Sequence, residues 1–404
     1  MRGDYMTEST KPRVIVSGIL FWYPLAGVTF QFLHYLIGLR KLGYDPYYIE
    51  DSARWPYSPQ LGDSTPDAQS NIDRVAPILH AYGFQNRWAF RGRYEHGKCY
   101  GLTPSQLEEL YTSADILLNV TGAQELYEEH RRVPVRAYLE TDPVESQIQV
   151  HKGNRSVIRA LQQHTHHFSF GENLGRPDCG LPVEHFQWRP TRQPVVLDLW
   201  QPLPPTSGSR YNTIATWKNK GKDIEFGGEI YYWSKDREFE KVIDLPQARP
   251  LGFELASNPD PASAARLIAH GWHLSDPVHI SADMNRYRDF IRSARGEFTV
   301  AKDQNIRLRS GWFSDRSACY LAAGRPVINQ DTAFGVSLPT GRGLFAFSTM
   351  DDILAALDAI ESDYDGHCRA ARDLAEEYLD AEKVLRKIMD TIGCTPACKL
   401  PSVI

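Results

Sequence analysis

Residues 13–49 follow the order strand, helix, strand, and this order constrains the fold more than any other feature of the chain. Arg13–Leu20 is a short apolar run rich in β-branched residues, which is typical of a buried strand. Val28–Leu42 has apolar residues at helical spacing, and Gly43 is placed to end that helix. Asp45–Ile49 predicts the next strand. This is the minimal βαβ unit of a parallel sheet, so we expect an α/β fold.

The same alternation continues beyond this unit. Ser105–Thr112 predicts a helix, and three later runs predict buried strands: Asp115–Val120, Val135–Leu139 and His166–Phe170. Ligands of open α/β sheets gather at the carboxyl ends of the strands. The residues at those ends here are Gly18, Gly122, Glu140, Asp142 and Glu172.

The chain has 404 residues, and single cores stop growing at roughly 250–300 residues. Gln201–Ser209 is the strongest linker signal, because its prolines are stiff and its Ser-Gly step interrupts regular structure. We therefore predict two Rossmann-like domains that face each other across a ligand-binding cleft. The predicted parts are a first domain over 12–200, a linker over 201–209, a second domain over 210–365, a helix over 366–392 and a tail over 393–404.

A second series of strands follows the predicted linker. The expected strands are Tyr211–Trp217, Phe253–Ala256, His279–Ser281, Glu297–Ala301 and Pro326–Asn329. Two amphipathic helices, Asp351–Ile360 and Gly366–Ile392, are expected to end the fold.

Charge and cysteine content exclude several classes of protein. The net charge of −5 and the pI near 6.2 argue against a protein whose main task is to bind nucleic acid, which requires a basic surface. The six cysteines are scattered, so no disulfide framework or zinc-ribbon spacing is visible. The apolar stretch Val14–Leu39 is interrupted by Pro24 and Gly27, which favours a strand and a buried helix over a membrane span. Because no signal peptide is visible, we expect a cytoplasmic protein.

The segment Arg307–Phe334, RLRSGWFSDRSACYLAAGRPVINQDTAF, carries the most chemistry. It predicts a loop, a helix that starts at Ser314 or Asp315, a turn, and a buried strand from Pro326. The start of such a helix presents free backbone N–H groups and the positive end of a dipole, which suit an anion. Basic side chains bracket it, so a diphosphate would meet both kinds of donor; they are Lys302, Arg307, Arg309 and Arg316.

Three parts of this segment together resemble the donor-binding region of GT-B glycosyltransferases: Gly-Trp-Phe-Ser-Asp-Arg at 311–316, Gly-Arg-Pro-Val-Ile at 324–328 and Gln-Asp-Thr at 330–332. The likeness is greatest to bacterial CgeB-type glycosyltransferase-like proteins, and the first turn is similar to a plant-type Gly-Trp-x-Ser signature. Gly-Leu-Arg-Lys-Leu-Gly-Tyr at 38–44 also fits the first domain of that family. The resemblance implies a GT-B fold whose last helix crosses back to the first domain.

The resemblance also implies a hexosyltransferase-like activity with a nucleotide-diphosphate sugar, most simply a UDP-sugar, as donor. In that case the donor-binding residues are Gly27, Lys218, Lys222, His279, Arg309, Ser310, Gly311, Trp312, Phe313, Ser314, Asp315, Arg316, Asp331 and Thr332. Ser314–Arg316 would lie at the diphosphate, and Asp331 and Thr332 near the sugar. Retaining members of the family place two glutamates where this chain has Gly311 and Cys319, so the stereochemical course does not carry over.

Glycosyl transfer requires a base near the acceptor hydroxyl, and Glu140 and Asp142 are the candidates because both follow a strand of the first domain. The alternative for Asp142 is a structural role as the cap of a helix that begins at Pro143. GT-B enzymes use cationic side chains and helix dipoles for the leaving group, so we expect no metal and no cofactor besides the donor. His166 and His167 are adjacent in a predicted strand and point to opposite faces, which disfavours a metal site.

Two other functions are compatible with the sequence. The first is glycosylation of modified DNA bases, for which the stretch Arg87–Arg93 offers arginines between aromatic residues. The second is a non-catalytic module that binds nucleotide sugars. The acceptor is expected to contact aromatic stretches of the first domain, Trp55–Tyr57 and Trp88–Tyr100, and could be a small molecule, a lipid or a polymer.

Overall fold

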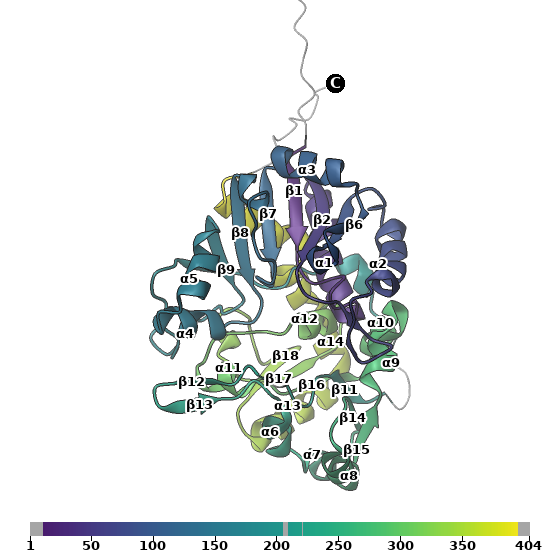
Figure 1. Cartoon of the computed structure of the whole chain (residues 1–404). Coiled ribbons are helices and arrows are strands. Elements are labelled where there is room, and N and C mark those ends of the chain that lie inside the picture. The colour runs from purple at the N-terminus through teal and green to yellow at the C-terminus, as the bar shows by residue number, and fades with distance from the viewer. Residues whose placement is uncertain (1–10, 205–208, 220, 395–404) are drawn as a thin grey trace, which may run out of the picture.

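The computed structural model describes residues 11–204, 209–219 and 221–394, which form two α/β halves stacked end to end (Figure 1). The described part of the first half holds an eight-stranded sheet with the order β10-β9-β8-β7-β1-β2-β5-β6. All neighbouring strands of this sheet are parallel except β5 and β6. Its strands are β1 (Arg13–Ser17), β2 (Asp45–Ser52), β5 (Trp88–Gly92), β6 (Lys98–Gly101), β7 (Ile116–Val120), β8 (Val135–Glu140), β9 (His166–Ser169) and β10 (Trp188–Pro190).

The helices of the first half pack on both faces of this sheet. The α-helices are α1 (Ala26–Lys41), α2 (Gln69–Ala81), α3 (Pro104–Ser113), α4 (Glu145–His151) and α5 (Arg155–Gln162). Shorter elements are the strands β3 (Tyr57–Ser58) and β4 (Asp63–Ser64) and the 3₁₀ turns η1 (Arg93–Glu95), η2 (His130–Arg132) and η3 (Leu197–Trp200). The alternating register buries Val14 and Val16 against α1 and Ile15 against α3, which gives the first half two apolar layers.

The described second half holds a six-stranded parallel sheet with the order β15-β14-β11-β16-β17-β18. Its strands are β11 (Tyr211–Ile214), β14 (Phe253–Ala256), β15 (Trp272–Ser275), β16 (Gly296–Thr299), β17 (Val327–Gln330) and β18 (Leu344–Phe347). Its helices are α6 (Asp236–Glu240), α7 (Leu245–Ala248), α8 (Pro261–Ala269), α9 (Pro277–Ser281), α10 (Met284–Arg292), α11 (Asp303–Arg307), α12 (Asp315–Ala322), η4 (Phe334–Val336), α13 (Met350–Ser362) and α14 (Tyr364–Leu374).

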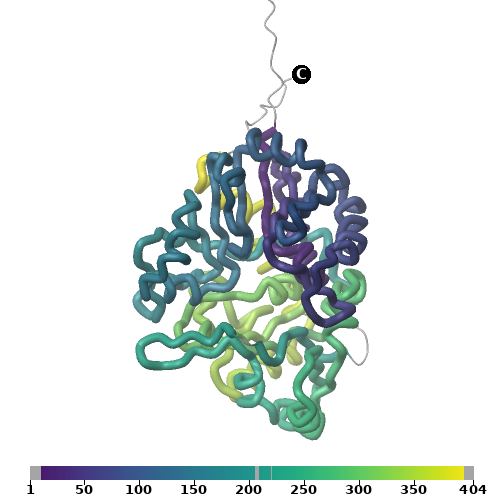
Figure 2. The backbone as a smooth tube through the Cα atoms, viewed as in Figure 1, coloured from purple at the N-terminus to yellow at the C-terminus, as the bar shows by residue number. Residues whose placement is uncertain are grey.

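A hairpin of β12 (Ile224–Phe226) and β13 (Glu229–Tyr231) leaves this second half and reaches the first (Figure 2). Ile224 lies in one apolar cluster with Val144 and Ile148, which belong to the first half. The ring of Phe226 meets the His151 ring edge-on. The hairpin therefore ties the two halves together beside α4.

The end of the chain crosses back to the first half, as predicted. The π-helical turn η5 (Ala375–Leu379) and α15 (Ala381–Thr391) follow α14, and α15 packs on α1. The expected single helix over 366–392 is broken at Asp380, because Leu379 and Ala381 bond the backbone of Val195 instead of the helix. The Asp380 side chain accepts the N–H groups of Glu382 and Lys383 and so starts a new helix.

The predicted strand His279–Ser281 is wrong, since these residues lie in helix α9. Asp276 accepts the backbone N–H groups of Val278 and His279, and Pro277 occupies the first helical position. The helix cap at Asp276 and the proline at the first helical position favour a helix more strongly than the β-branched residues favour a strand. The strand at this edge of the sheet is instead Trp272–Ser275.

The boundaries predicted for the domains, the linker and the tail stay predictions. Residues 201–204 of the predicted linker have no helix or strand, while 205–208, together with 395–404 of the predicted tail, lie outside the described residues. Within residues 11–204, 209–219 and 221–394, no helix is long and apolar enough to cross a membrane.

Candidate functional site

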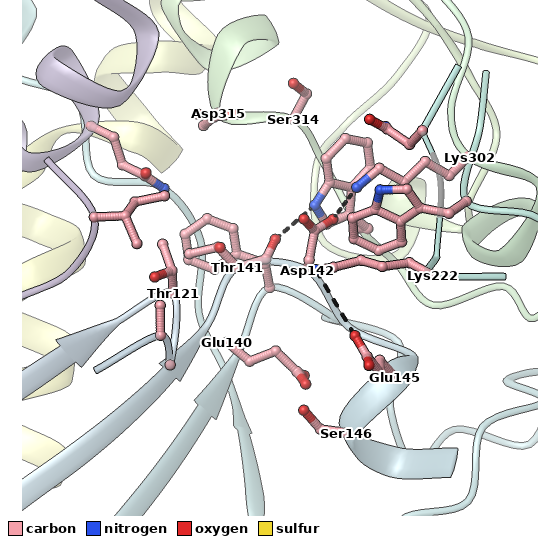
Figure 3. A pocket seen from close by; sticks show the side chains of 18 of the residues that line it. Thr121, Glu140, Thr141, Asp142, Glu145, Ser146, Lys222, Lys302, Ser314 and Asp315 are labelled. Carbon is pink, nitrogen blue, oxygen red and sulfur yellow. Dashed lines mark hydrogen bonds and ion pairs between the residues drawn. The ribbon is translucent and has the colours of Figure 1, made fainter. Parts of the chain in front are cut away.

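The carboxyl ends of both sheets face a cleft of about 740 Å³ that is lined by residues of both halves (Figure 3). The two walls differ in charge. The wall of the first half carries the carboxylates of Glu140, Asp142 and Glu145 and one cation, Arg54. The wall of the second half carries one carboxyl group, Asp315, and four basic residues, which are Lys222, Lys235, Lys302 and Arg316. An anionic ligand is therefore favoured on the second wall.

Glu140 ends strand β8, and its side chain is only 3% exposed. One oxygen, Oε2, accepts hydrogen bonds from Ser169 Oγ at 2.6 Å and Gln147 Nε2 at 2.8 Å. The other oxygen, Oε1, is buried and has no partner among the described residues. Burial raises the pKa of this carboxyl to about 7. Such a group can exchange a proton at neutral pH.

The backbone beside Glu140 is strained at two β-branched residues. Thr121, just after β7, has φ 72°, and Val144, just before α4, has φ 106°. Positive φ is unfavourable for side chains branched at Cβ, and strain of this kind concentrates at functional sites. Thr121 lines the cleft, and its Oγ1 is buried and has no hydrogen-bond partner in the described chain.

Lys302 and Asp142 join the two walls of the cleft. Lys302 Nζ lies 2.6 Å from Asp142 Oδ1 and 3.3 Å from the centre of the Trp233 ring. Trp312 Nε1 donates to the Thr141 carbonyl at 2.9 Å, one residue before Asp142. Burial lowers the pKa of Lys302. The carboxylate and the indole rings thus hold the ammonium group at a fixed place in the cleft.

Lys235 is the second buried amine of this wall, and the sequence analysis did not select it. Lys235 is the residue directly before α6, and it is 7% exposed. Within residues 11–204, 209–219 and 221–394, no carboxylate forms an ion pair with its amino group. Burial lowers the pKa of Lys235 well below its usual value, and the cations Arg316 and Lys302 lower it further. Nothing in the local sequence distinguishes this lysine from Lys218 and Lys222, which the analysis chose instead.

The start of helix α12 reaches the cleft through Ser314, Asp315 and Arg316. Ser314 occupies the N-cap position, yet its side chain caps no N–H group. Burial raises the pKa of Asp315. The Arg316 guanidinium is turned toward the sheet, where Nε donates to the fully buried Glu297 at 2.6 Å and Nη2 to Thr299 at 3.0 Å. Arg316 therefore holds the sheet and the helix start together.

Several predicted donor residues lie at the interface between the halves and not in the cleft. Asn173 N donates to the Ser310 carbonyl, and Gly311 has φ 79°, with Asn173 N 2.3 Å from where a Cβ would lie. Arg309 pairs with Asp178 and Asp331. Thr332 Oγ1 donates to the Trp312 carbonyl, and Phe313 is buried in an apolar cluster that both halves form. These residues hold the loop that presents Trp312.

Three further predicted residues also lie outside the cleft lining. Gly27 faces the hydroxyl of Tyr287, with 3.2 Å between that oxygen and a Cβ built on the glycine. Lys218 lies near Asp236 at 3.7 Å, and Lys222 alone of the predicted lysine pair reaches the cleft. His279 contacts Arg286 on the surface.

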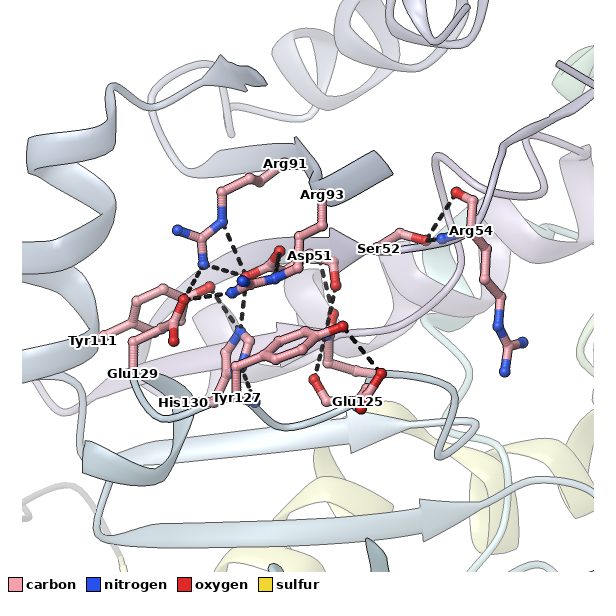
Figure 4. Close-up of polar contacts among 11 residues, drawn as sticks. Asp51, Ser52, Arg54, Arg91, Arg93, Tyr111, Glu125, Tyr127, Glu129 and His130 are labelled. Carbon is pink, nitrogen blue, oxygen red and sulfur yellow. Dashed lines mark hydrogen bonds and ion pairs between the residues drawn. The ribbon is translucent and has the colours of Figure 1, made fainter. Parts of the chain in front are cut away.

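The arginines between aromatic residues in 87–93 are paired with carboxylates (Figure 4). Arg91 and Arg93 both bind Asp51 and Glu129, and the Asp51 side chain is fully buried. Burial raises the pKa of Asp51, but His130, Arg91 and Arg93 outweigh it and hold this pKa far below its usual value. The stretch is thus a structural ion-pair network.

In the described residues, no group of three or more His, Cys, Asp or Glu side chains is placed to hold a metal ion. His164 and His167 instead bond the backbone carbonyls of Ala160 and Leu161. His34 is buried, and burial lowers its pKa to about 3.

Solved structures share the fold of this protein over almost the whole chain. An alpha-glucosyltransferase in complex with UDP-glucose and DNA containing an abasic site is 10% identical, with a TM-score of 0.58 over 95% of this chain and 99% of that one. HepE of Anabaena, in complex with UDP and glucose, is 9% identical, with a TM-score of 0.54 over 95% and 100%. Sucrose-phosphate synthase from Thermosynechococcus elongatus is 11% identical, with a TM-score of 0.50 over 95% and 98%.

The chain has the GT-B fold. No protein-family model matches the sequence, and no curated protein matches it either. At these low identities the likeness extends to the GT-B fold alone.

Proposed function

We propose that this GT-B protein transfers a sugar from a nucleoside-diphosphate sugar to the hydroxyl group of an acceptor. The observation that carries the proposal is the cleft whose cationic wall faces a carboxylate wall at the carboxyl ends of two parallel sheets. UDP is the nucleotide that we favour, because structural neighbours in complex with UDP or UDP-glucose share the fold.

The diphosphate would lie against Lys235, Lys302 and the start of helix α12. Lys235 supports this placement because a buried amine without a counter-ion gains most from an anion. Ser314 adds a hydroxyl that is not used as a helix cap. Two lysines and a helix N-terminus supply the positive charge that a leaving diphosphate requires, so we retain a metal-independent reaction in the proposal.

Glu140 is the proposed base, because its carboxyl group lines the cleft and has a raised pKa, and it takes the proton of the acceptor hydroxyl. As the acceptor oxygen bonds to the anomeric carbon, the bond from that carbon to the diphosphate breaks and the nucleotide leaves with the electron pair. Asp142 is proposed to pair with Lys302 in the free protein and to release its ammonium group to the bound diphosphate. Glu140 and Asp142, which the sequence analysis named together as candidate bases, thus have different proposed roles.

The activity is tested by thermal-shift screening with UDP-, GDP-, TDP- and ADP-sugars, followed by an assay of UDP release from the sugar that stabilises the protein. We expect a UDP-sugar to raise Tm and to be turned over slowly even without acceptor. Stabilisation without any release of nucleotide would point to the non-catalytic binding module. No stabilisation by any of the four would contradict the proposal.

Glycosylation of DNA bases is not favoured, although one neighbour is an alpha-glucosyltransferase in complex with DNA. The arginines that kept this alternative open, Arg87, Arg91 and Arg93, are all paired with carboxylates. A relationship to CgeB-type proteins and a cytoplasmic location remain part of the proposal.

A further inference from the structure

Helix α5 turns three apolar side chains toward the cleft, and two of them, Val157 and Ala160, are not fully covered by protein. Val157, Ala160 and Leu161 line the cleft, while Arg155 and Arg159 lie on the opposite, exposed side of the helix. Of these apolar residues, Leu161 is buried, Val157 is half-buried and Ala160 is exposed. An apolar helix stripe normally packs on a core, so this one is free to pack on a ligand.

Polar groups face this stripe from α4 and the end of β7. Ser146 and Gln149 of α4 line the same part of the cleft, together with Tyr138. Tyr138 OH lies 3.3 Å from Ser146 Oγ. Thr121 contributes the buried Oγ1 that has no partner in the described chain. Hydroxyl and amide groups opposite an apolar surface match a ring that carries hydroxyl groups on its edge.

The charges near this groove exclude an anionic occupant. The carboxylates of Glu140, Asp142 and Glu145 line its inner side. Lys222 is 3.9 Å from Glu145 and Lys302 is 2.6 Å from Asp142, so both nearby lysines have carboxylate partners. Arg54, the cation that the first half contributes to the cleft lining, lies over the ring of Trp22.

We infer that the acceptor is an uncharged, hydroxyl-bearing ring compound, most simply a neutral glycoside, bound between α5 and the Thr121 turn. This inference rests on the proposed function. The ring packs on Val157 and Ala160, its outer hydroxyl groups bind Gln149 and Ser146, and the reacting hydroxyl donates to the Glu140 carboxylate. A phosphate-rich acceptor such as DNA would meet the carboxylates instead.

A steric variant with a matched control tests the position of the acceptor. Ala160→Phe fills the groove, and Ser156→Phe places the same ring on the same helix outside the cleft lining. With the UDP-sugar that stabilises the protein, we expect Ala160→Phe to reduce transfer to neutral p-nitrophenyl glycosides at least tenfold. For Ala160→Phe, we expect the UDP affinity and the acceptor-independent UDP release to stay within twofold of wild type. Ser156→Phe should change neither of these quantities nor the rate of transfer. Equal transfer by both variants overturns the inference.

A charge variant tests the class of acceptor. We expect the wild-type protein to prefer p-nitrophenyl glucoside over p-nitrophenyl glucuronide at least tenfold in kcat/KM, and Glu145→Lys to reduce that preference at least fivefold. A preference for the glucuronide or for duplex DNA, or UDP release without transfer to any neutral glycoside, overturns the inference and leaves the proposed function standing. Absence of both UDP binding and UDP release would instead mean that the proposed function itself has failed.

Discussion

Lys302 Nζ of the second half lies 2.6 Å from Asp142 Oδ1 of the first half, and this ion pair crosses the cleft. Because a bound diphosphate would compete with Asp142 for the same ammonium group, the pair links donor binding to the contact between the halves. The Trp233 ring beneath the ammonium group holds it in position for either partner.

Removing Asp142 should therefore strengthen donor binding. We expect Asp142→Asn to lower the Kd for UDP by roughly 3–5-fold, since a partly exposed ion pair is worth about 1 kcal/mol or less. Lys302→Met should raise the Kd by about 10–100-fold, because a hydrogen bond to a charged group contributes about 1.5–3 kcal/mol. Titration calorimetry measures both, and weaker binding by Asp142→Asn would disprove the competition.

Glu140→Gln should reduce kcat by about 100-fold or more while leaving the Kd for UDP unchanged, because a general base contributes about 10²–10⁴-fold. The wild-type rate should rise with pH and level off above about pH 7, where Glu140 is ionised. Asp142→Asn is the matched control and should keep kcat within about tenfold. The reverse ranking of the two variants would move the base to Asp142.

The carboxyl group of Glu140 should also make the free energy of unfolding depend on pH. Its folded pKa of about 7 lies above the unfolded value of 4.5, so the native state holds the extra proton between these values. The free energy of unfolding contributed by Glu140 is greatest below pH 4.5 and falls as pH rises through 7. Glu140→Gln removes this fall, and urea titrations at pH 5 and 8 measure the difference. An identical pH dependence in the variant would contradict the assignment.

Lys235→Met should stabilise the free protein by on the order of 1 kcal/mol at pH 7, because it removes a buried cation without a counter-ion. The folded pKa lies below the unfolded value of 10.5, so the destabilisation is fully present below the folded pKa and disappears above about pH 10.5. The gain should thus shrink as the solution becomes alkaline. Lys383→Met, at an exposed surface pair, should change stability little.

Arg316→Ala should unfold the protein more easily and not simply weaken donor binding. It leaves Glu297, whose side chain is fully buried, without its ionic partner, and breaking a buried pair costs about 3–5 kcal/mol. Chemical denaturation measures this loss. The double variant Arg316→Met with Glu297→Gln should recover part of it, and an unchanged midpoint for Arg316→Ala would refute the structural role.

Gly311→Ala should separate the halves locally. The new Cβ would lie 2.3 Å from Asn173 N, at a residue with φ 79°, so the loop before Trp312 has to move. We expect a loss of about 2 kcal/mol or more in the free energy of unfolding. Gly341→Ala, at φ 98° with no atom within 4 Å of the new Cβ, is the control for backbone strain alone.

The sequence predicted β1, β7, β8 and β14 because these strands are continuous apolar runs between turn residues, but it did not predict β5, β6, β10, β15 or β18. Phe253–Ala256 agrees in both limits, and the ends of β8 and α12 placed Glu140, Asp142 and Ser314–Arg316 at the cleft. The direction of a side chain was harder to predict. Arg316 was expected to face a diphosphate, but its guanidinium binds the buried Glu297. Glu297 also accepts a hydrogen bond from Thr213, 84 positions away, and no local pattern connects either residue to Arg316.

Lys235 was missed for a related reason. It enters the cleft because the β12–β13 hairpin folds onto the first half and brings Trp233 and Lys235 beneath Trp312. That placement depends on a tertiary contact and not on spacing along the chain. His279 was misplaced because a local cap at Asp276 outweighed strand propensity.

The most direct test of the donor site is the affinity of UDP for Lys235→Met, measured by titration calorimetry beside wild type and Lys383→Met. A buried amine that binds the diphosphate contributes about 1.5–3 kcal/mol, so the Kd of Lys235→Met should rise about 10–100-fold while that of Lys383→Met stays unchanged. Equal UDP affinity in all three proteins, or no UDP binding by wild type, would contradict the account of the cleft.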